Sequence, residues 1–141
     1  MLKIENERKD KPGYGSVNLE HAEIGDSFYS LIISSEKSQR PLAVRHYTIT
    51  RALKRDIEAK RADGSLAKFS RKVFVDNASI DRTGVQWAFD QIQRNRAVKW
   101  AVKAIESSLH EDGASIDAEL VAALQAWCQR HAIPIPTGPS L

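Results

Sequence analysis

The chain has little of what cross-links a small protein or anchors it to a membrane. Its 141 residues include a single cysteine, Cys128, and no apolar run approaches the roughly 18 residues that a membrane-spanning helix needs. One cysteine can neither close a disulfide within the chain nor share a zinc site with a second cysteine. The start, MLKIENERKDK, also lacks the apolar stretch of a secretory signal. We therefore expect a cytoplasmic protein that makes no contact with a membrane.

The motifs of common catalytic sites are missing as well. The sequence contains no GxxxxGK[ST], GxGxxG or GxSxG, so phosphate-loop and hydrolase-elbow functions have no support. The four histidines are dispersed, and no HExxH or CxxC spacing brings two metal ligands together. We predict a non-enzymatic protein without metal or cofactor, although an active site built from distant residues need not leave a motif.

What the sequence does contain is typical of a folded domain. Apolar residues make up 42% of the chain and charged residues 28%, which is ordinary for a globular protein. The turn-forming stretch KPGYG closes a charged N-terminal segment, and the tail AIPIPTGPSL cannot continue a helix. We predict a single α+β domain over residues 16–132, preceded by a mobile arm at 1–15 and followed by a proline-rich tail at 133–141.

Three segments have the pattern of strands, and a fourth resembles them. Residues 27–34, SFYSLIIS, form a short apolar run bounded by GD and SEKSQRP, as in a buried strand. Residues 42–49 alternate as its hairpin partner would, and residues 68–76 place Ser70, Lys72 and Phe74 on one face. A further strand is expected at 17–24.

Between these strands the spacing of apolar residues changes from that of a strand to that of a helix. Projected at 100° per residue, Ile49, Leu53 and Ile57 fall on one side of a helix, and the Asp63–Gly64 pair supplies a terminating signal. We therefore predict an inserted helix over residues 50–62.

Two helices are predicted in the C-terminal half. TGVQ, residues 83–86, has the form of a capping box, and the helix that it starts changes its apolar side across QRNR, residues 93–96. A kink or one continuous helix would explain the change, and the continuous helix is favoured because neither proline nor glycine is present there. The second helix covers residues 115–131, with Ser115 as its cap. The predicted fold is thus a small antiparallel sheet of three or four strands with one inserted helix, followed by two C-terminal helices.

Positive charge is concentrated in two blocks. Residues 40–72 hold ten Lys or Arg against three Asp or Glu, and residues 82–103 hold five against one. The last block, residues 104–141, holds one basic residue against five acidic ones. Such asymmetry bears on partners and on electrostatic steering.

The basic residues that project away from the local apolar stripes are candidates for contacts with nucleic-acid phosphates. A tryptophan at the edge of one basic face could stack on a base. The same pattern also fits the ordinary solvated face of an amphipathic helix. The predicted nucleic-acid contacts are Arg51, Lys54, Arg55, Arg61, Lys68, Arg71, Lys72, Arg96, Lys99, Trp100 and Lys103.

We predict an accessory or regulatory protein that binds nucleic acid of unspecified type mainly through its phosphates. The alternative is a small inhibitor or adaptor, of the kind that mobile elements carry, which docks on an acidic protein surface. Trp87 would then be an anchor for the partner, because it projects away from the stripe of Val85, Phe89 and Ile92. A helix that is apolar on both sides also suggests a homodimer.

Overall fold

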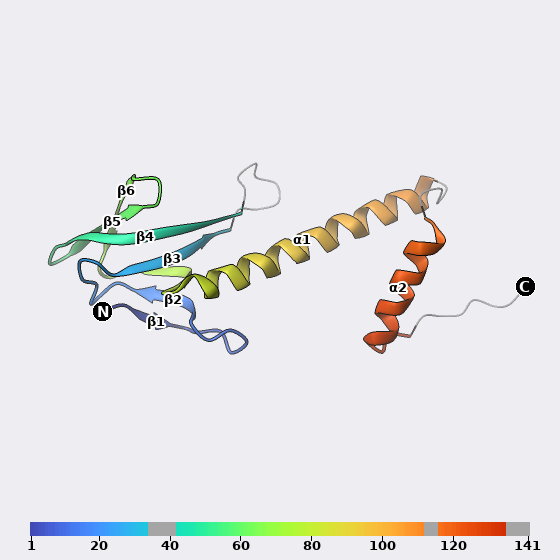
Figure 1. Cartoon of the computed structure of the whole chain (residues 1–141), viewed down its shortest axis with the longest axis horizontal. Coiled ribbons are helices and arrows are strands. Elements are labelled where there is room, and N and C mark those ends of the chain that lie inside the picture. Colours follow the sequence, from blue (N-terminus) through green and yellow to red (C-terminus); the bar gives the residue numbers. More distant parts are fainter. Residues whose placement is uncertain (34–41, 112–115, 135–141) are drawn as a thin grey trace, which may run out of the picture. The chain divides into compact units, whose positions relative to one another are not determined.

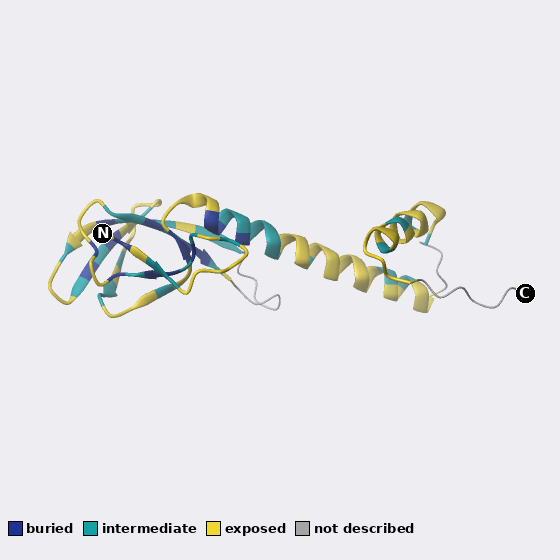
Figure 2. Cartoon of the chain, turned by 90° about the horizontal axis from the view of Figure 1, so that it is seen from below, coloured by how far each residue is buried: buried dark blue, intermediate teal, exposed yellow. Residues whose placement is uncertain are grey.

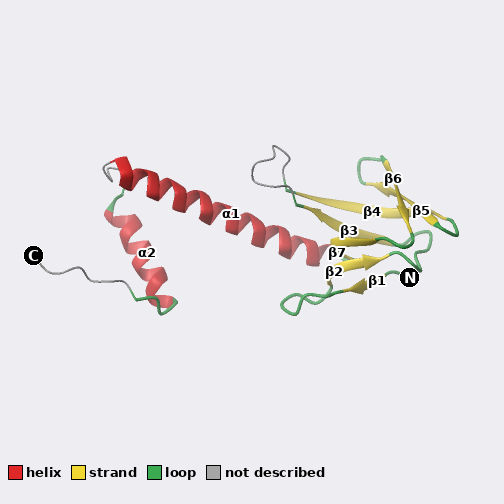
Figure 3. Ribbon diagram, turned by 180° about the vertical axis from the view of Figure 1, so that it is seen from behind, coloured by secondary structure: helices red, strands yellow, loops and turns green. Residues whose placement is uncertain are grey.

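The computed structural model describes residues 1–33, 42–111 and 116–134. The chain divides into two compact units, Met1–Arg94 and Asn95–Leu141, and the long helix α1, Arg82–Glu111, contributes residues to both. Figure 1 labels the elements along the chain, and Figure 3 distinguishes the strands of the first unit from the two helices. Each unit is described by itself below.

The first unit contains a seven-stranded sheet in which every neighbouring pair is antiparallel. The order across the sheet is β1-β2-β7-β3-β4-β5-β6, so the last strand in the sequence lies between the second and the third. The strands are β1 Lys3–Glu5, β2 Tyr14–Asn18, β3 Ser27–Ile32, β4 Ala43–Ala52, β5 Asp56–Arg61, β6 Leu66–Ser70 and β7 Phe74–Ser79.

One face of this sheet forms the larger core. Its apolar cluster includes residues of all seven strands, from Ile4 of β1 to Phe69 of β6. Phe28, at its centre, is fully buried and lies 5.0 Å from the ring of Tyr47. Because both outer strands contribute to the same cluster, the sheet curls around this face. Figure 2 shows the buried positions gathered along the strands.

The opposite face of the sheet is covered in part by the start of α1. Gly84, Val85 and Ala88 are the buried residues of this helix, and they pack near Tyr14 and Leu31. A Cβ atom at Gly84 would lie 2.6 Å from the Cβ of Ser79, so glycine permits this close approach of helix and sheet. From Gln93 to Glu111 no described residue of α1 is buried.

Asp81 caps α1, not Thr83 as the TGVQ pattern predicted. Its Oδ1 accepts hydrogen bonds from the backbone N–H groups of Thr83, at 2.9 Å, and Gly84, at 3.4 Å. Val85 N–H donates to the hydroxyl of Ser79 at 3.1 Å, which joins the first turn to the end of β7. The cap lies two residues earlier than predicted because the Asp81 carboxylate supplies the acceptor. The prediction that it continues through residues 93–96 is confirmed.

The second helix, α2, spans Ala118–Arg130, and none of its residues is buried. Its cap is Asp117, whose Oδ1 accepts a hydrogen bond from Leu120 N–H at 2.9 Å. The predicted cap, Ser115, lies outside the described residues. Among the described residues, neither helix combines the length and apolar character required to cross a membrane.

The predicted sheet of three or four strands with an inserted helix was wrong, although the α+β class is confirmed. Residues 50–62 form the end of β4, a turn and β5. Ile57 and Ala59 alternate along β5, which pairs with both β4 and β6, and they are fully buried because they face the larger core. Ile49 and Ile57, which the helical period placed on one side, belong to two antiparallel strands joined by a turn, and strand pairing decided the structure.

Other strand boundaries also differ from those predicted. The expected strand at 68–76 is interrupted by a turn at 71–73 that separates β6 from β7, and the strand expected at 17–24 ends at Asn18.

Residues 1–15, expected as a mobile arm, contain β1 and the start of β2. Leu2 and Tyr14 are buried there, so the segment joins the sheet. Of the expected tail at 133–141, residues 135–141 lie outside the described part.

Candidate functional site

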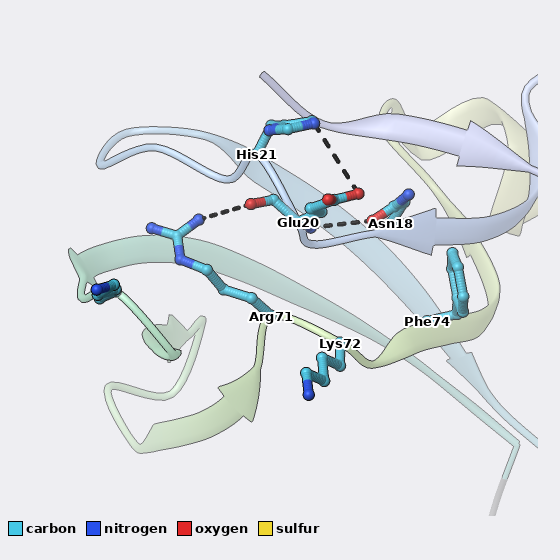
Figure 4. Close-up of a pocket in the computed structure, with 7 residues that line it drawn as sticks. Asn18, Glu20, His21, Arg71, Lys72 and Phe74 are labelled. Atoms are coloured by element: carbon cyan, nitrogen blue, oxygen red, sulfur yellow. Dashed lines mark hydrogen bonds and ion pairs between the residues drawn. The ribbon is translucent and has the colours of Figure 1, made fainter.

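Three turns meet at one end of the curled sheet and border an open cavity of about 540 Å³. They are the loop after β2, the β4–β5 turn and the β6–β7 turn, which the antiparallel strand order brings to the same end. We call this cavity the sheet-end pocket. Figure 4 shows the side chains that line it, which are Asn18, Glu20, His21, Lys54, Arg71, Lys72 and Phe74.

Arg71 holds the three turns together. Its Nε donates a hydrogen bond to the Leu53 carbonyl at 2.6 Å, and its Nη1 donates to the carbonyls of Glu20 and Ala22, both at 3.0 Å. The Arg71 backbone N–H also donates to the Arg55 carbonyl at 2.9 Å. Figure 4 shows the side chain reaching across to Glu20. Arg71 therefore fixes the arrangement of the three turns around the pocket. Its Nε and Nη1 groups are already hydrogen-bonded, and its positive charge remains at the pocket wall.

Two lysines add positive charge to the sheet-end pocket. Lys54 and Lys72 have exposed side chains, and Arg55, next to Lys54 in the β4–β5 turn, is exposed as well. None of the three forms an ion pair with any residue in the part of the chain that the structure describes. The carboxylate that lines the pocket belongs to Glu20, whose Oε2 lies 3.9 Å from Nε2 of His21. The pocket is thus predominantly cationic.

An exposed aromatic ring lies beside these cations. Phe74, the first residue of β7, is 52% exposed, and it pairs directly with Asn18 of β2 in the register of the sheet. Asn18 is engaged within its own chain, because its amide donates to Glu5 and its Oδ1 accepts from Glu20 N–H. Phe74 was not among the predicted nucleic-acid contacts, although the alternation of residues 68–76 had placed it with Lys72 on one face.

Three further residues predicted to contact nucleic acid interact with side chains of their own chain, elsewhere on the sheet. Arg51 lies 4.0 Å from Glu58, and Lys68 lies 3.8 Å from Asp56, so a carboxylate offsets each charge. The guanidinium of Arg61 lies 5.7 Å from the centre of the Tyr47 ring and donates to the Ser65 hydroxyl at 3.0 Å. The sheet-end pocket and its rim therefore contain only Lys54, Arg55, Arg71 and Lys72 of the predicted residues in 51–72.

The remaining predicted nucleic-acid contacts belong to the second unit. Arg96, Lys99, Trp100 and Lys103 all lie on α1 beyond Arg94, and the indole of Trp100 is 70% exposed. None of these four residues lines the sheet-end pocket of the first unit.

Trp87, predicted as an anchor for a protein partner, is half-buried against its own chain. Its ring packs 6.3 Å from that of Tyr14, and the guanidinium of Arg8 lies 5.6 Å from the centre of its ring. A second, shallower cavity of about 410 Å³ lies beside it, lined by Arg82, Thr83, Gln86, Trp87 and Asp90. Arg8 and Tyr14 of the N-terminal segment thus cover part of the Trp87 ring, for which the sequence showed no partner.

Perturbed ionisable groups lie away from the sheet-end pocket. Hydrogen bonds from the Thr83 side chain and from nearby backbone N–H groups lower the pKa of Asp81, and bonds from Ser65 lower the pKa of Asp63. Burial raises the pKa of Tyr14. In the described ranges, no group of three or more His, Cys, Asp or Glu side chains could hold a metal ion. The arrangement of the pocket is suited to binding an anion and an apolar ring.

Comparison of the chain with known families, with curated proteins and with solved structures gives no match.

Proposed function

We propose that the protein is a nucleic-acid-associated accessory or regulatory protein, and that the sheet-end pocket binds a single strand. The observation that carries the proposal is the exposed ring of Phe74 in a pocket lined by Lys54, Arg71 and Lys72. Lysine and arginine neutralise phosphates, while an exposed ring offers a stacking surface to a base.

A single strand fits this chemistry better than a duplex does. Bases in a duplex are stacked inside the helix, whereas an unpaired base can leave its neighbours and stack on an aromatic side chain. Because the cations and Phe74 line one cavity, a phosphate and a base of the same strand could be held together. The ordered framework that Arg71 provides reduces the conformational entropy lost on binding.

Fluorescence anisotropy with short single- and double-stranded DNA and RNA tests this proposal. A variant with Lys54, Arg55 and Lys72 changed to alanine is expected to bind a single strand at least tenfold more weakly and to show a shallower dependence on salt. Phe74→Ala is expected to weaken binding by roughly 1–3 kcal/mol while keeping the salt slope, because it removes stacking and leaves the charges.

A matched control removes equal charge elsewhere on the first unit. Lys9, Arg45 and Lys60 are exposed and lie outside the sheet-end pocket, so their triple alanine variant should bind almost as the unchanged protein does. A second variant, with Arg96, Lys99 and Lys103 changed to alanine, measures the contribution of the helical unit. Equal losses in the pocket variant and the control would show diffuse attraction, and the pocket proposal would then fail.

The alternative is that the same cations dock on an acidic protein, acting as an inhibitor or adaptor. Absence of binding to every oligonucleotide at low salt would favour this alternative, and a pull-down with the unchanged protein and the pocket variant would then seek the partner. We also propose a cytoplasmic location, which cell fractionation would check.

A further inference from the structure

The second half of α1 carries a line of apolar side chains that are exposed or half-buried. Val98, Val102 and Leu109 are 61%, 46% and 62% exposed, and Ile105 completes the line as a half-buried residue. Among the described residues of the second unit, none is buried. Helices in water owe most of their stability to packing of an amphipathic face, so this line requires a partner.

The spacing of the four residues is that of a coiled coil. Successive separations of four, three and four residues place them at positions d, a, d and a of a heptad. Asn95 then occupies the preceding a position, where asparagine is used to set the register and number of helices. We call residues 98, 102, 105 and 109 the α1 seam. Its geometry fits another helix with the same repeat.

Charges beside the α1 seam are complementary to those of another copy of α1 that runs in the opposite direction. Lys99 and Glu106 both occupy e positions, and antiparallel helices place e residues opposite each other. Two such pairs of opposite charge would form. In a parallel pair, Arg94 at position g would instead face Lys99 of the second copy, and like charges at that place repel.

We infer that the α1 seam is an antiparallel interface between two copies of this chain. In the matching register, Val98 packs on Leu109 of the second copy, and Val102 packs on Ile105 of the second copy. Ala101 and Ser108, at the g positions, are small enough for the helices to approach closely. Arg96, Trp100 and Lys103 lie at outward positions, so dimerisation leaves them exposed. The inference goes beyond nucleic-acid binding and is tested separately from it.

Sedimentation of the full chain over a range of concentrations tests whether the dimer forms. The unchanged protein should shift from monomer to dimer as concentration rises, whereas Val102→Glu and Ile105→Glu should stay monomeric. Ser107→Glu, at the outward f position, is the matched control and should dimerise normally. Because no described residue of the second unit is buried, these changes leave the core of the monomer intact. A chain that stays monomeric throughout would overturn the inference.

Charge exchange tests the pairing of Lys99 with Glu106. These residues are seven positions apart, about 10 Å along the helix, so they do not form an ion pair with each other within one helix. Lys99→Glu and Glu106→Lys should each weaken dimerisation by about tenfold, and the double variant should restore it. Additive losses in the double variant would overturn the proposed pairing.

Disulfide trapping reports the direction of the helices. In a Cys128→Ser background, a tagged Val98→Cys protein is mixed with Leu109→Cys protein under mild oxidation. The antiparallel register predicts the mixed disulfide as the main product. Dominant links between identical positions would show a parallel pair and overturn the inference.

Discussion

The two units of this chain differ sharply in where they bury apolar side chains. In the first unit, Phe28, Ile57 and Val85 are fully buried, whereas the described residues of the second unit include no buried position. Figure 2 makes the contrast visible as dark strands and a largely exposed distal helix. A curled sheet can cover one face with its own strands, but an amphipathic helix needs another element. Intramolecular packing can account for the stability of the first unit, whereas the apolar side chains in the described part of the second unit remain largely exposed.

Equivalent truncations in the two units should therefore have very different effects. Ile57→Ala removes a fully buried side chain from the larger core and should lower the free energy of unfolding by about 2–5 kcal/mol. Leu109→Ala alters a 62% exposed residue and should change the stability of the dilute monomer by less than about 0.5 kcal/mol. Chemical denaturation followed by near-ultraviolet circular dichroism measures both. Similar losses would contradict the contrast between the units.

The junction of α1 with the sheet should tolerate little added volume. Gly84→Ala places a Cβ atom 2.6 Å from the Cβ of Ser79, and should lower the free energy of unfolding by about 1–3 kcal/mol. Ser107→Ala, on the exposed distal half of α1, is the control and should be neutral or slightly stabilising. Thermal melts of the two variants give the comparison, and an unchanged melting temperature for Gly84→Ala would show that the helix can shift without cost.

The caps of the two helices give a finer comparison. Asp81→Ala should cost about 1 kcal/mol in the unfolding of the first unit, because the cap joins the packed start of α1 to β7. Asp117→Ala removes the equivalent hydrogen bond at α2 and should reduce helicity without altering the unfolding of the sheet. Far-ultraviolet circular dichroism and denaturant unfolding separate the two results. A loss of sheet stability in Asp117→Ala would show that the units unfold together.

The smallest effect should appear as a pH dependence. The pKa of Asp81 is lowered in the folded chain, chiefly by the hydrogen bond from the Thr83 side chain, so the ionised carboxylate stabilises the fold. This contribution is complete above the unfolded value of about 3.9 and is lost as pH falls below it through the folded pKa. Unfolding measured from neutral pH to pH 3 should show a shallower decline for Asp81→Asn than for the unchanged protein. Parallel curves would rule out a contribution from this cap.

Part of the sheet-end pocket could be predicted from sequence, because exposed basic residues are recognisable from composition and local pattern. Lys54, Arg55, Arg71 and Lys72 were all selected in this way. Lys54 and Arg55 were selected on the assumption that residues 50–62 form a helix, whereas they lie in a turn between two strands. Arg71 and Lys72 were selected on an expected strand at 68–76, whereas they lie in the turn between β6 and β7. Arg71 binds carbonyls of two other turns, Leu53 at 18 positions away in the chain and Glu20 and Ala22 at 51 and 49 positions away, which no local pattern shows.

The sequence alone determined the features that depend on neighbours along the chain. These are the strand at Ser27–Ile32, the continuous helix α1, the amphipathic helix α2 and the α+β class. Tertiary structure decided that residues 56–61 form a strand, that β7 lies between β2 and β3, and that Phe74 joins the lysines in one pocket. The physical reason is that helix periodicity and capping act over a few residues, whereas strand pairing is stabilised by hydrogen bonds and burial between distant segments.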